Sequence, residues 1–401
     1  GATPRRGLAK AEVDRRLERD GPNEIKAAAH VSAWKILFQQ FKNVLIVILD
    51  AFAAPAFDLM LDRDPSWKDR LDGFTYYQDA LGVYPSTLPS IPAILSGRTY
   101  ENAEPLSRFL RENLSQDSLP TVLRDHGFRT HTVSETIYGQ YLEDVPFSDQ
   151  ISFLDALPQD RRLRDSLRIW NVTLFRYSPH FLKRQVYADH KWILAGNPGR
   201  DDSPSPAASP FSDADSLRVP TPGQNASWIL WREMVDNARA GGSDPTFKFL
   251  HIFTTHLPFF MDGNCRQITK DQYAEWGWVP AIIEQSTCAM TQVEELLDRM
   301  RELEVLDRTL VILAADHGNH INLLAGENDD PEWQPIPGVS KVLPLLLVKP
   351  MGAAGPLKVS QAPVSLADIP RTVAADMGVS HEFPGQSFQA TGEDETRTRV
   401  Y

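Results

Sequence analysis

An unbroken apolar run near the start of the chain limits the folds that this sequence can adopt. Residues 44–49 are six consecutive aliphatic side chains, and Asp50 follows them directly. A strand that is apolar at every position is covered on both faces, which is typical of the parallel sheet of an α/β protein. Function in open α/β sheets gathers beyond the carboxyl ends of the strands. Asp50 is therefore a candidate functional residue.

A second apolar run repeats this design near the other end of the chain. Residues 309–315 are followed by Asp316, His317 and Gly318. If both runs are strands of one sheet, the residues after them meet at the same edge. Carboxylate oxygens bind divalent cations, and imidazole suits zinc-like or manganese-like ions. The sequence thus predicts a metal site from Asp50, Asp316 and His317; the alternative for Asp-His-Gly alone is an ordinary turn.

Composition excludes some classes of function. The 401 residues can form one large α/β domain or two smaller ones. A formal charge of −12 argues against nucleic acid as the main partner. An anionic substrate remains possible where a metal supplies local positive charge. No apolar stretch approaches the ~20 residues of a membrane span, and no signal-peptide pattern opens the sequence, so we expect a soluble chain.

From residue 43 onward, strand and helix patterns alternate. They predict a three-layer α/β/α fold around a central, mostly parallel sheet. Further strands are predicted at residues 129–133, 247–254 and 342–348, and helices at residues 55–72, 91–95, 119–126, 291–306 and 367–377. Residues 197–223 are rich in proline and predict a long loop or insertion. Residues 391–401 are charged, and we expect a frayed tail there.

Residues 1–42 differ from the rest. A charged amphipathic helix is predicted at residues 11–20, where Gly21-Pro22-Asn23 ends it, and a second helix at residues 32–41. The pattern resembles the N-terminal cytoplasmic segment of cation-transporting P-type ATPases. The Asp-Lys-Thr-Gly-Thr phosphorylation run of that family is missing, so the resemblance implies no transport. We expect a helical appendage that was joined to an unrelated domain near Asn43.

Thr87 is a candidate nucleophile. It lies between Pro85 and Pro89, directly before a predicted helix whose free N–H groups favour an anion. A hydroxyl in that place can attack an ester phosphorus when a metal promotes its deprotonation. The alternative is a threonine that only caps the helix, and local sequence alone favours that interpretation.

Several ordered motifs resemble the alkaline phosphatase superfamily, and the sulfatase-like branch fits best. The motifs lie at residues 43–50, 86–98 and 310–318, with further support at residues 342–348, 365–373 and 384–387. The resemblance spans residues 43–390. It implies an alkaline-phosphatase/sulfatase-like catalytic domain over that range, with the insertion at residues 197–223 inside it.

The nucleophile position separates two groups within this branch. Sulfatases carry Cys or Ser, which is converted to formylglycine, in a Cys-x-Pro-Ser-Arg motif. Here Thr87 lies at the Cys position of this motif and Ile91 at its Arg position. In addition, Ala51 follows Asp50 at a position where sulfatases have a second acid. Lipoteichoic acid synthases and phosphoethanolamine transferases use threonine, and they also resemble residues 254–259, which include His256. The resemblance therefore implies a metal-dependent phosphoric ester hydrolase or phosphotransferase.

The resemblance also implies roles for individual residues. One divalent cation, most simply Mn²⁺ or Zn²⁺ with Ca²⁺ or Mg²⁺ as alternatives, would be held by Asp50, Thr87, Asp316 and His317. Thr87 would attack a phosphodiester and carry the headgroup as a phosphothreonine. His256 would bind the phosphate or protonate the leaving group, and Arg98 would help to orient the nucleophile loop. The substrate would be an anionic ester such as a lipid or cell-envelope glycan headgroup.

Two histidines and two cysteines remain. His251 and His320 lie near these motifs and can support the metal ligands, although a satisfied core or surface histidine is the simpler interpretation for each. The resemblance favours a disulfide between Cys265 and Cys288, because catalytic domains of this kind lie outside the cytoplasm. With no anchor or signal peptide in the sequence, localisation stays open.

Two other functions compete with phosphoryl transfer. A sulfatase acting on sulfate esters is the first, and Thr87 argues against it. A non-catalytic relic of the fold is the second. The presence of all four of Asp50, Thr87, Asp316 and His317 argues against a relic, which we would expect to contain no stoichiometric metal.

Overall fold

The computed structural model describes residues 42–133, 159–187, 193–194, 222–239, 244–319, 323 and 339–399. The chain divides into two units, residues 1–40 and 41–401, and every described residue belongs to the second. The helices predicted before residue 42 lie outside the described residues. The same holds for His320 and nearly all of the proline-rich stretch 197–223.

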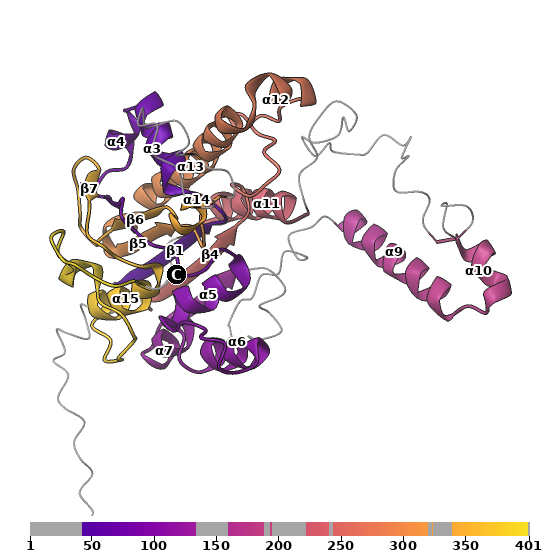
Figure 1. Cartoon of the computed structure of the whole chain (residues 1–401), viewed down its shortest axis with the longest axis horizontal. Helices are drawn as coiled ribbons and strands as arrows, with labels where there is room; N and C mark the ends of the chain where they lie inside the picture. The colour runs from indigo at the N-terminus through magenta and orange to yellow at the C-terminus, as the bar shows by residue number, and fades with distance from the viewer. Residues whose placement is uncertain are drawn as a thin grey trace, which may run out of the picture. The chain divides into compact units, whose positions relative to one another are not determined.

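A seven-stranded sheet forms the centre of the described fold (Figure 1). Its order is β3-β4-β1-β5-β6-β2-β7. The strands are β1 (Asn43–Leu49), β2 (Thr75–Tyr77), β3 (Arg129–Val133), β4 (Thr246–Ile252), β5 (Thr309–Ala314), β6 (Leu346–Lys349) and β7 (Lys358–Ser360). Only β6 runs antiparallel to its neighbours; the pairs β3–β4, β4–β1, β1–β5 and β2–β7 are parallel. The predicted, mostly parallel sheet is confirmed.

β1 lies inside the sheet and is buried on both faces. Val47 pairs with Leu250 of β4 on one side and with Leu313 of β5 on the other. Alternate side chains of β1 enter two separate cores, for example Val47 in one and Ile46 in the other. This is the arrangement that an unbroken apolar strand requires, because each face of the sheet must be covered.

Helices cover both faces of the sheet, which makes three layers (Figure 1). One core includes side chains of α3 (Ala54–Arg63), α4 (Trp67–Arg70), α11 (Pro222–Asn237) and α13 (Trp278–Glu302). The other core includes side chains of α5 (Thr87–Ser96), α6 (Leu106–Ser115), α7 (Leu119–Asp125) and α15 (Ile369–Met377). Smaller helices are α12 (Lys270–Trp276) and α14 (Val339–Val342), with 3₁₀ turns η1 (Leu306–Arg308), η2 (Leu366–Asp368) and η3 (Phe388–Ala390). None of the described helices is long and apolar enough to cross a membrane.

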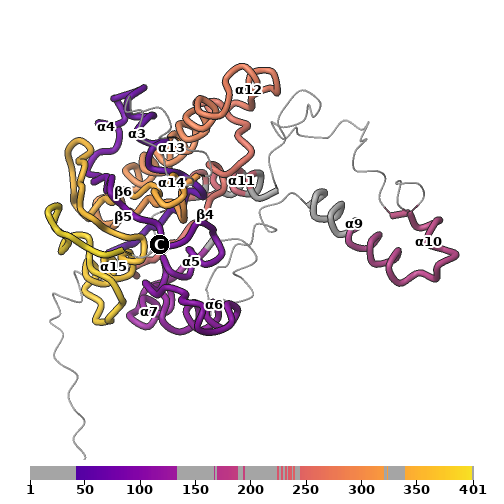
Figure 2. Tube along the Cα trace, in the orientation of Figure 1, coloured from indigo at the N-terminus to yellow at the C-terminus, as the bar shows by residue number. Residues whose placement is uncertain are grey.

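Some element boundaries differ from the prediction for physical reasons. α5 begins at Thr87 rather than at residue 91, because Pro89 lies in the first turn, where the N–H group has no helical partner to lose. α13 begins at Trp278 rather than at residue 291, since buried polar residues such as Gln285 interrupt the apolar pattern of its first half. α5 and α15 lie side by side although they are far apart in sequence (Figure 2).

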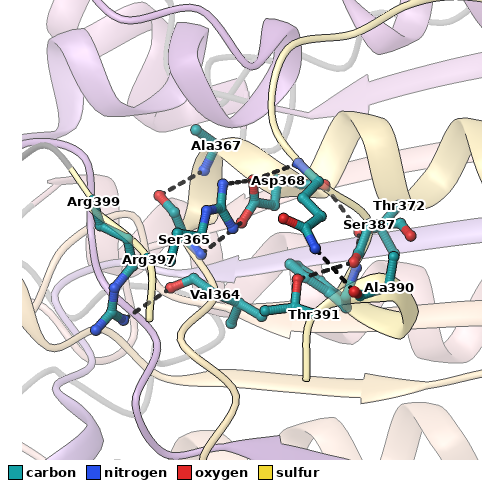
Figure 3. Close-up of polar contacts among 12 residues, drawn as sticks. Val364, Ser365, Ala367, Asp368, Thr372, Ser387, Ala390, Thr391, Arg397 and Arg399 are labelled. Atoms are coloured by element: carbon teal, nitrogen blue, oxygen red, sulfur yellow. Dashed lines mark hydrogen bonds and ion pairs between the residues drawn. The ribbon is translucent and has the colours of Figure 1, made fainter. Parts of the chain in front are cut away.

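The predicted frayed tail is wrong. Arg397 forms a two-pronged ion pair with the fully buried carboxylate of Asp368, with Nη2 2.7 Å from Oδ1 (Figure 3). Arg399 donates to the backbone oxygen of Val364 at 3.2 Å and pairs with Asp79 at 2.8 Å. The charges of this segment find partners inside the fold, so the chain is fixed as far as residue 399.

Candidate metal-binding active site

Asp50 follows β1 directly, and both its backbone N–H and its backbone carbonyl form hydrogen bonds. Its N–H donates to the Ile252 oxygen of β4 at 2.9 Å, and Thr255 Oγ1 donates to its carbonyl oxygen at 2.6 Å. The side chain is fully buried. The carboxylate is therefore fixed at the carboxyl edge of the sheet, as the sequence predicted.

Asp316 reaches the same edge from β5. The side chain is fully buried, and its Oδ1 accepts a hydrogen bond from the Ala51 N–H at 3.1 Å. Ala51 adopts a left-handed backbone conformation, with φ of 59°, which turns this amide toward Asp316. The turn after β1 thus binds Asp316, the acid that follows β5.

Gly318 allows the Asp-His-Gly segment to pass close to α14. A Cβ atom at this position would lie 1.7 Å from the backbone oxygen of Ser340, and the Gly318 N–H donates to the Lys341 oxygen at 2.8 Å. Only a residue without a side chain fits such an approach. The glycine therefore helps to place Asp316 and His317.

Thr87 and His317 complete the cluster that the sequence predicted. Thr87 Oγ1 donates to Asp50 Oδ2 at 3.3 Å and lies 3.4 Å from His317 Nε2. The same ring nitrogen lies 3.4 Å from Asp316 Oδ2, while His317 Nδ1 lies 2.7 Å from the Gly318 oxygen, which fixes the ring. Thr87 is the first residue of α5, so the free N–H groups of that helix end lie beside the cluster.

His251 is a member of the cluster that sequence reasoning underrated. Its Nε2 lies 3.0 Å from Asp50 Oδ2, and the ring is fully buried. Donor atoms of Asp50, His251 and Asp316 all lie within 4.8 Å of one another. The available signal was a histidine next to the last residue of a mainly apolar strand. Its meaning depends on β4 being the neighbour of β1, with His251 opposite Ile48.

The two acids have opposite electrostatic surroundings. Burial acts to raise the pKa of Asp50, but the hydrogen bond from His251 and the charges of three nearby histidines bring it below the usual value. Burial and the neighbouring charge of Asp50 raise the pKa of Asp316. Two buried like charges at short range are unfavourable without a compensating cation.

The donor set fits a divalent metal ion. Asp50 Oδ1 and Asp316 Oδ2 are buried and have no hydrogen-bond partner, whereas buried polar atoms are normally satisfied. Two carboxylates with imidazoles of His251 and His317 are the ligand types that zinc-like and manganese-like ions prefer. These residues could therefore hold one such ion.

His256 lies at the more open side of the cluster. It is partly exposed, and its Nδ1 lies 2.6 Å from the Leu257 oxygen. Gln285 donates to the His256 backbone oxygen at 3.2 Å, and Gln224 also donates to it. The charge of His256 contributes to lowering the pKa of Asp50, as expected for a nearby ring. Cys265 and Cys288 form the disulfide that the resemblance implied, and Cys288 belongs to the same helix as Gln285.

Arg98 lies outside this site. It follows the C-terminal end of α5, while Thr87 begins the helix, and at ~1.5 Å per residue the two are separated by roughly 16 Å along the axis. Its exposed guanidinium pairs with Asp117 at 2.7 Å. This position fits the simpler interpretation of a cation at a helix end, and the expected role of Arg98 in orienting the nucleophile loop stays a prediction.

The sequence model of the Sulfatase family matches residues 42–379. The chain belongs to the sulfatase family. A second model, described as the N-terminus of cation transporters/ATPases, matches residues 1–54. A comparison with curated proteins finds no match.

Solved structures align with this chain at low sequence identity. Ps i-CgsB aligns with a TM-score of 0.52 at 14% identity, over 88% of this chain and 77% of that one. A protein of the alkaline phosphatase superfamily from Vibrio parahaemolyticus aligns with a TM-score of 0.50 at 13% identity, over 84% and 67%. The lipoteichoic acid synthase LtaP from Listeria monocytogenes aligns with a TM-score of 0.49 at 13% identity, over 89% and 76%. The predicted alkaline-phosphatase/sulfatase-like fold is confirmed.

Proposed function

We propose that this member of the sulfatase family is a metal-dependent enzyme that hydrolyses or transfers phosphate esters with Thr87 as its nucleophile. The observation that carries the proposal is the position of the Thr87 hydroxyl, 3.3 Å from Asp50 and 3.4 Å from His317. The hydroxyl belongs to the first residue of a helix and lies beside two buried carboxylates, which is the combination that an anionic ester and a cation need.

The residues that would hold the cation are Asp50, His251, Asp316 and His317, with the Thr87 oxygen beside them. A bound Mn²⁺ or Zn²⁺ would supply positive charge that favours the ionised hydroxyl and attracts the anionic substrate. The free N–H groups at the start of α5 add partial positive charge where the phosphoryl oxygens would lie.

The covalent step belongs to Thr87. A bond forms between Thr87 Oγ1 and phosphorus as the bond from phosphorus to the leaving alcohol breaks, and the leaving oxygen takes up a proton. Water or an acceptor hydroxyl then attacks the phosphothreonine, releases Thr87 and completes hydrolysis or transfer. The Thr87 hydroxyl gives its proton to Asp50, to which it already donates, and it regains a proton when water or the acceptor hydroxyl attacks.

His256 suits the role of proton donor or phosphate ligand. Its Nδ1 faces the Leu257 oxygen at 2.6 Å, which leaves Nε2 as the nitrogen that can donate when the ring is protonated. The ring is partly exposed, so a substrate can reach it, while the two glutamines on its backbone oxygen hold the loop in place.

Phosphate esters are favoured over sulfate esters by the chemistry of position 87. Formylglycine is made from Cys or Ser, and Thr87 is neither. We infer a phosphodiester substrate, such as a lipid or cell-envelope headgroup, from the resemblance of residues 254–259 to threonine-dependent phosphotransferases. Sulfate ester hydrolysis remains the second candidate because the matching family is Sulfatase. Faster turnover of an aryl sulfate than of a bis-aryl phosphate would favour that candidate.

Replacing the nucleophile tests the proposal. Thr87→Ala removes the only atom that can form the covalent bond, so we expect turnover of a bis-aryl phosphate with Mn²⁺ or Zn²⁺ to fall by about a thousandfold or more. Thermal unfolding should change little, because the side chain is partly exposed. Mass spectrometry of acid-quenched wild-type protein should find an aryl phosphate group on the peptide that contains Thr87.

Ser86→Ala is the matched control for this experiment. Ser86 is the exposed neighbouring hydroxyl, and its side chain makes no capping hydrogen bond to α5. We expect its activity to equal that of the wild type. Full phosphodiesterase activity in Thr87→Ala would show that the nucleophile lies elsewhere.

A further inference from the structure

The helices α9 (Gln159–Tyr177) and α10 (His180–Tyr187) form a hairpin in the chain between β3 and β4. The rings of Phe175 and Tyr187 contact each other with centroids 6.1 Å apart, and Lys183 Nζ lies 5.3 Å from the Phe175 ring. Residues after α10 return to the hairpin: the Leu194 N–H donates to Asn171 Oδ1 at 2.9 Å. The two helices therefore pack on each other along one side.

The hairpin and the residues that return to it also carry exposed apolar side chains. Seven of the ten large hydrophobic residues that are exposed in the described part of the chain lie here: Ile169, Trp170, Val172, Tyr177, Phe181, Ile193 and Leu194. Tyr177 and Phe181 flank the turn between the helices and are 80% and 78% exposed. Asn171 is buried while its neighbour Trp170 is exposed, which is the reverse of the order expected in a surface helix. A concentration of this kind marks an interaction surface.

The charge of the same segment indicates the kind of partner. The hairpin, residues 159–187, contains seven basic residues and two acidic ones, in a chain with a formal charge of −12; the basic residues are Arg161, Arg162, Arg164, Arg168, Arg176, Lys183 and Arg184, and the acidic ones are Asp160 and Asp165. Arg176 and Arg184 are exposed next to the aromatic residues of the turn. Aromatic and aliphatic side chains beside an excess of Lys and Arg over acidic residues suit the interface of a bilayer that contains anionic lipids. A second copy of this surface would bring like charges together.

We propose that the α9–α10 hairpin docks this enzyme onto anionic lipid bilayers, with Trp170, Tyr177 and Phe181 entering the headgroup region. Arg176 and Arg184 contact lipid phosphates beside them. Docking goes beyond the ester chemistry, because it needs neither the metal nor Thr87. It would keep the catalytic domain at a membrane whose lipids or attached polymers carry phosphodiesters.

Vesicle flotation with the full chain tests the proposal. In EDTA, we expect the protein to float with vesicles of equal parts phosphatidylglycerol and phosphatidylcholine, and much less with phosphatidylcholine alone. The triple variant Trp170→Ala/Tyr177→Ala/Phe181→Ala should lower the vesicle partition coefficient by about tenfold or more. Arg176→Glu/Arg184→Glu should abolish the preference for anionic vesicles. Trp278→Ala, at an exposed aromatic residue outside the hairpin, should float like the wild type.

Three outcomes would overturn the proposal. They are a wild-type chain that stays in solution with anionic vesicles, a triple variant that floats as well as the wild type, or a triple variant that changes only the oligomeric state in size-exclusion chromatography. The last outcome would make the hairpin a contact between copies of the chain. Circular dichroism melting and turnover of a soluble bis-aryl phosphate show whether each variant is folded. Since Thr87→Ala should float normally, failure of the proposed chemistry leaves this test intact.

Discussion

At the scale of single residues, Asp50 and Asp316 show that two buried carboxyls can have pKa values shifted in opposite directions. Burial acts to raise the pKa of both carboxyls. The hydrogen bond from His251 and the charges of His251, His256 and His317 reverse the effect of burial at Asp50. Asp316 is next to the negative charge of Asp50, which adds to the effect of burial. A cation between them would remove this conflict, and the two unpartnered oxygens are available to bind it.

Gly318 is the residue whose replacement should show how tightly the metal-binding segment is packed. In Gly318→Ala, the new Cβ would meet the backbone oxygens of Ser340 and Leu343 at 1.7 Å and 3.0 Å. Backbone atoms cannot rotate away as a side chain can, so the segment with Asp316 and His317 must shift. We expect a loss of roughly 1–3 kcal/mol in the free energy of unfolding, measured by urea denaturation, and at least a tenfold loss of turnover.

Gly392→Ala is the control for that substitution, because no atom lies within 4 Å of a Cβ built at Gly392. Its unfolding and turnover should match the wild type. If Gly318→Ala unfolds at the same denaturant concentration as Gly392→Ala, the close approach to Ser340 is not a constraint on the site.

Sequence reasoning found most of the cluster because strand ends are visible in a sequence. Asp50 and Asp316 follow apolar runs, and a parallel sheet brings such ends together. His251 was underrated because its importance depends on which strand lies beside β1, and strand order is set by the packing of the whole chain. Arg98 is close to the nucleophile motif in sequence but lies at the far end of α5 in space, which sequence spacing alone does not show.

At the scale of secondary-structure elements, α5 connects the active site to the C-terminal segment. Its first residue is Thr87, and its last turn ends at Gly97, which adopts a left-handed conformation with φ of 73°. A Cβ at Gly97 would lie 3.1 Å from the Ala367 oxygen of η2. The position of the nucleophile helix therefore depends on η2, and η2 in turn is held by the Asp368 carboxylate.

Arg397→Ala should destabilise this arrangement. Asp368 is fully buried and also accepts hydrogen bonds from the N–H groups of Ser365, at 2.8 Å, and Gln386, at 3.0 Å (Figure 3). Removing the guanidinium leaves a buried carboxylate without its counter-ion, which costs about 3 kcal/mol of folding free energy. Thermal and urea unfolding measure the loss.

Arg98→Ala supplies the comparison, because the Arg98–Asp117 pair is exposed and should contribute about 1 kcal/mol or less. The double variant Arg397→Ala/Asp368→Asn should recover part of the stability, since the buried charge is then gone. Equal effects of Arg397→Ala and Arg98→Ala would mean that the C-terminal ion pair is only a surface contact.

Elements were predictable where one pattern dominates. β3 has the predicted bounds, and β1 and β5 match the two apolar runs closely. The first half of α13 was missed because Gln285 and Ser286 are polar residues that the fold buries. The fixed tail was missed because the partners of Arg397 and Arg399 are distant in sequence, and charge alone suggests solvent.

At the scale of the whole molecule, the candidate metal site joins residues that are far apart in the sequence. Asp50 follows β1, His251 lies on β4 and Asp316 follows β5, three adjacent strands from separate parts of the chain. An ion bound by all three stabilises only the folded state, because the unfolded chain does not bring these residues together. Metal binding should therefore raise the free energy of unfolding of the whole protein.

Metal removal tests this coupling. Wild-type protein with excess Mn²⁺ or Zn²⁺ should melt at a higher temperature than protein in EDTA. At a metal concentration 100 times the Kd, binding adds about 2.7 kcal/mol to the free energy of unfolding. Asp316→Asn should remove this difference. In EDTA the variant should be at least as stable as the wild type, because the substitution relieves the repulsion between two buried acids. Asp376→Asn, at a partly buried carboxyl on α15, should keep the metal-dependent shift. Wild-type protein with the same melting temperature in metal and in EDTA would contradict a structural link between the ion and the three strands.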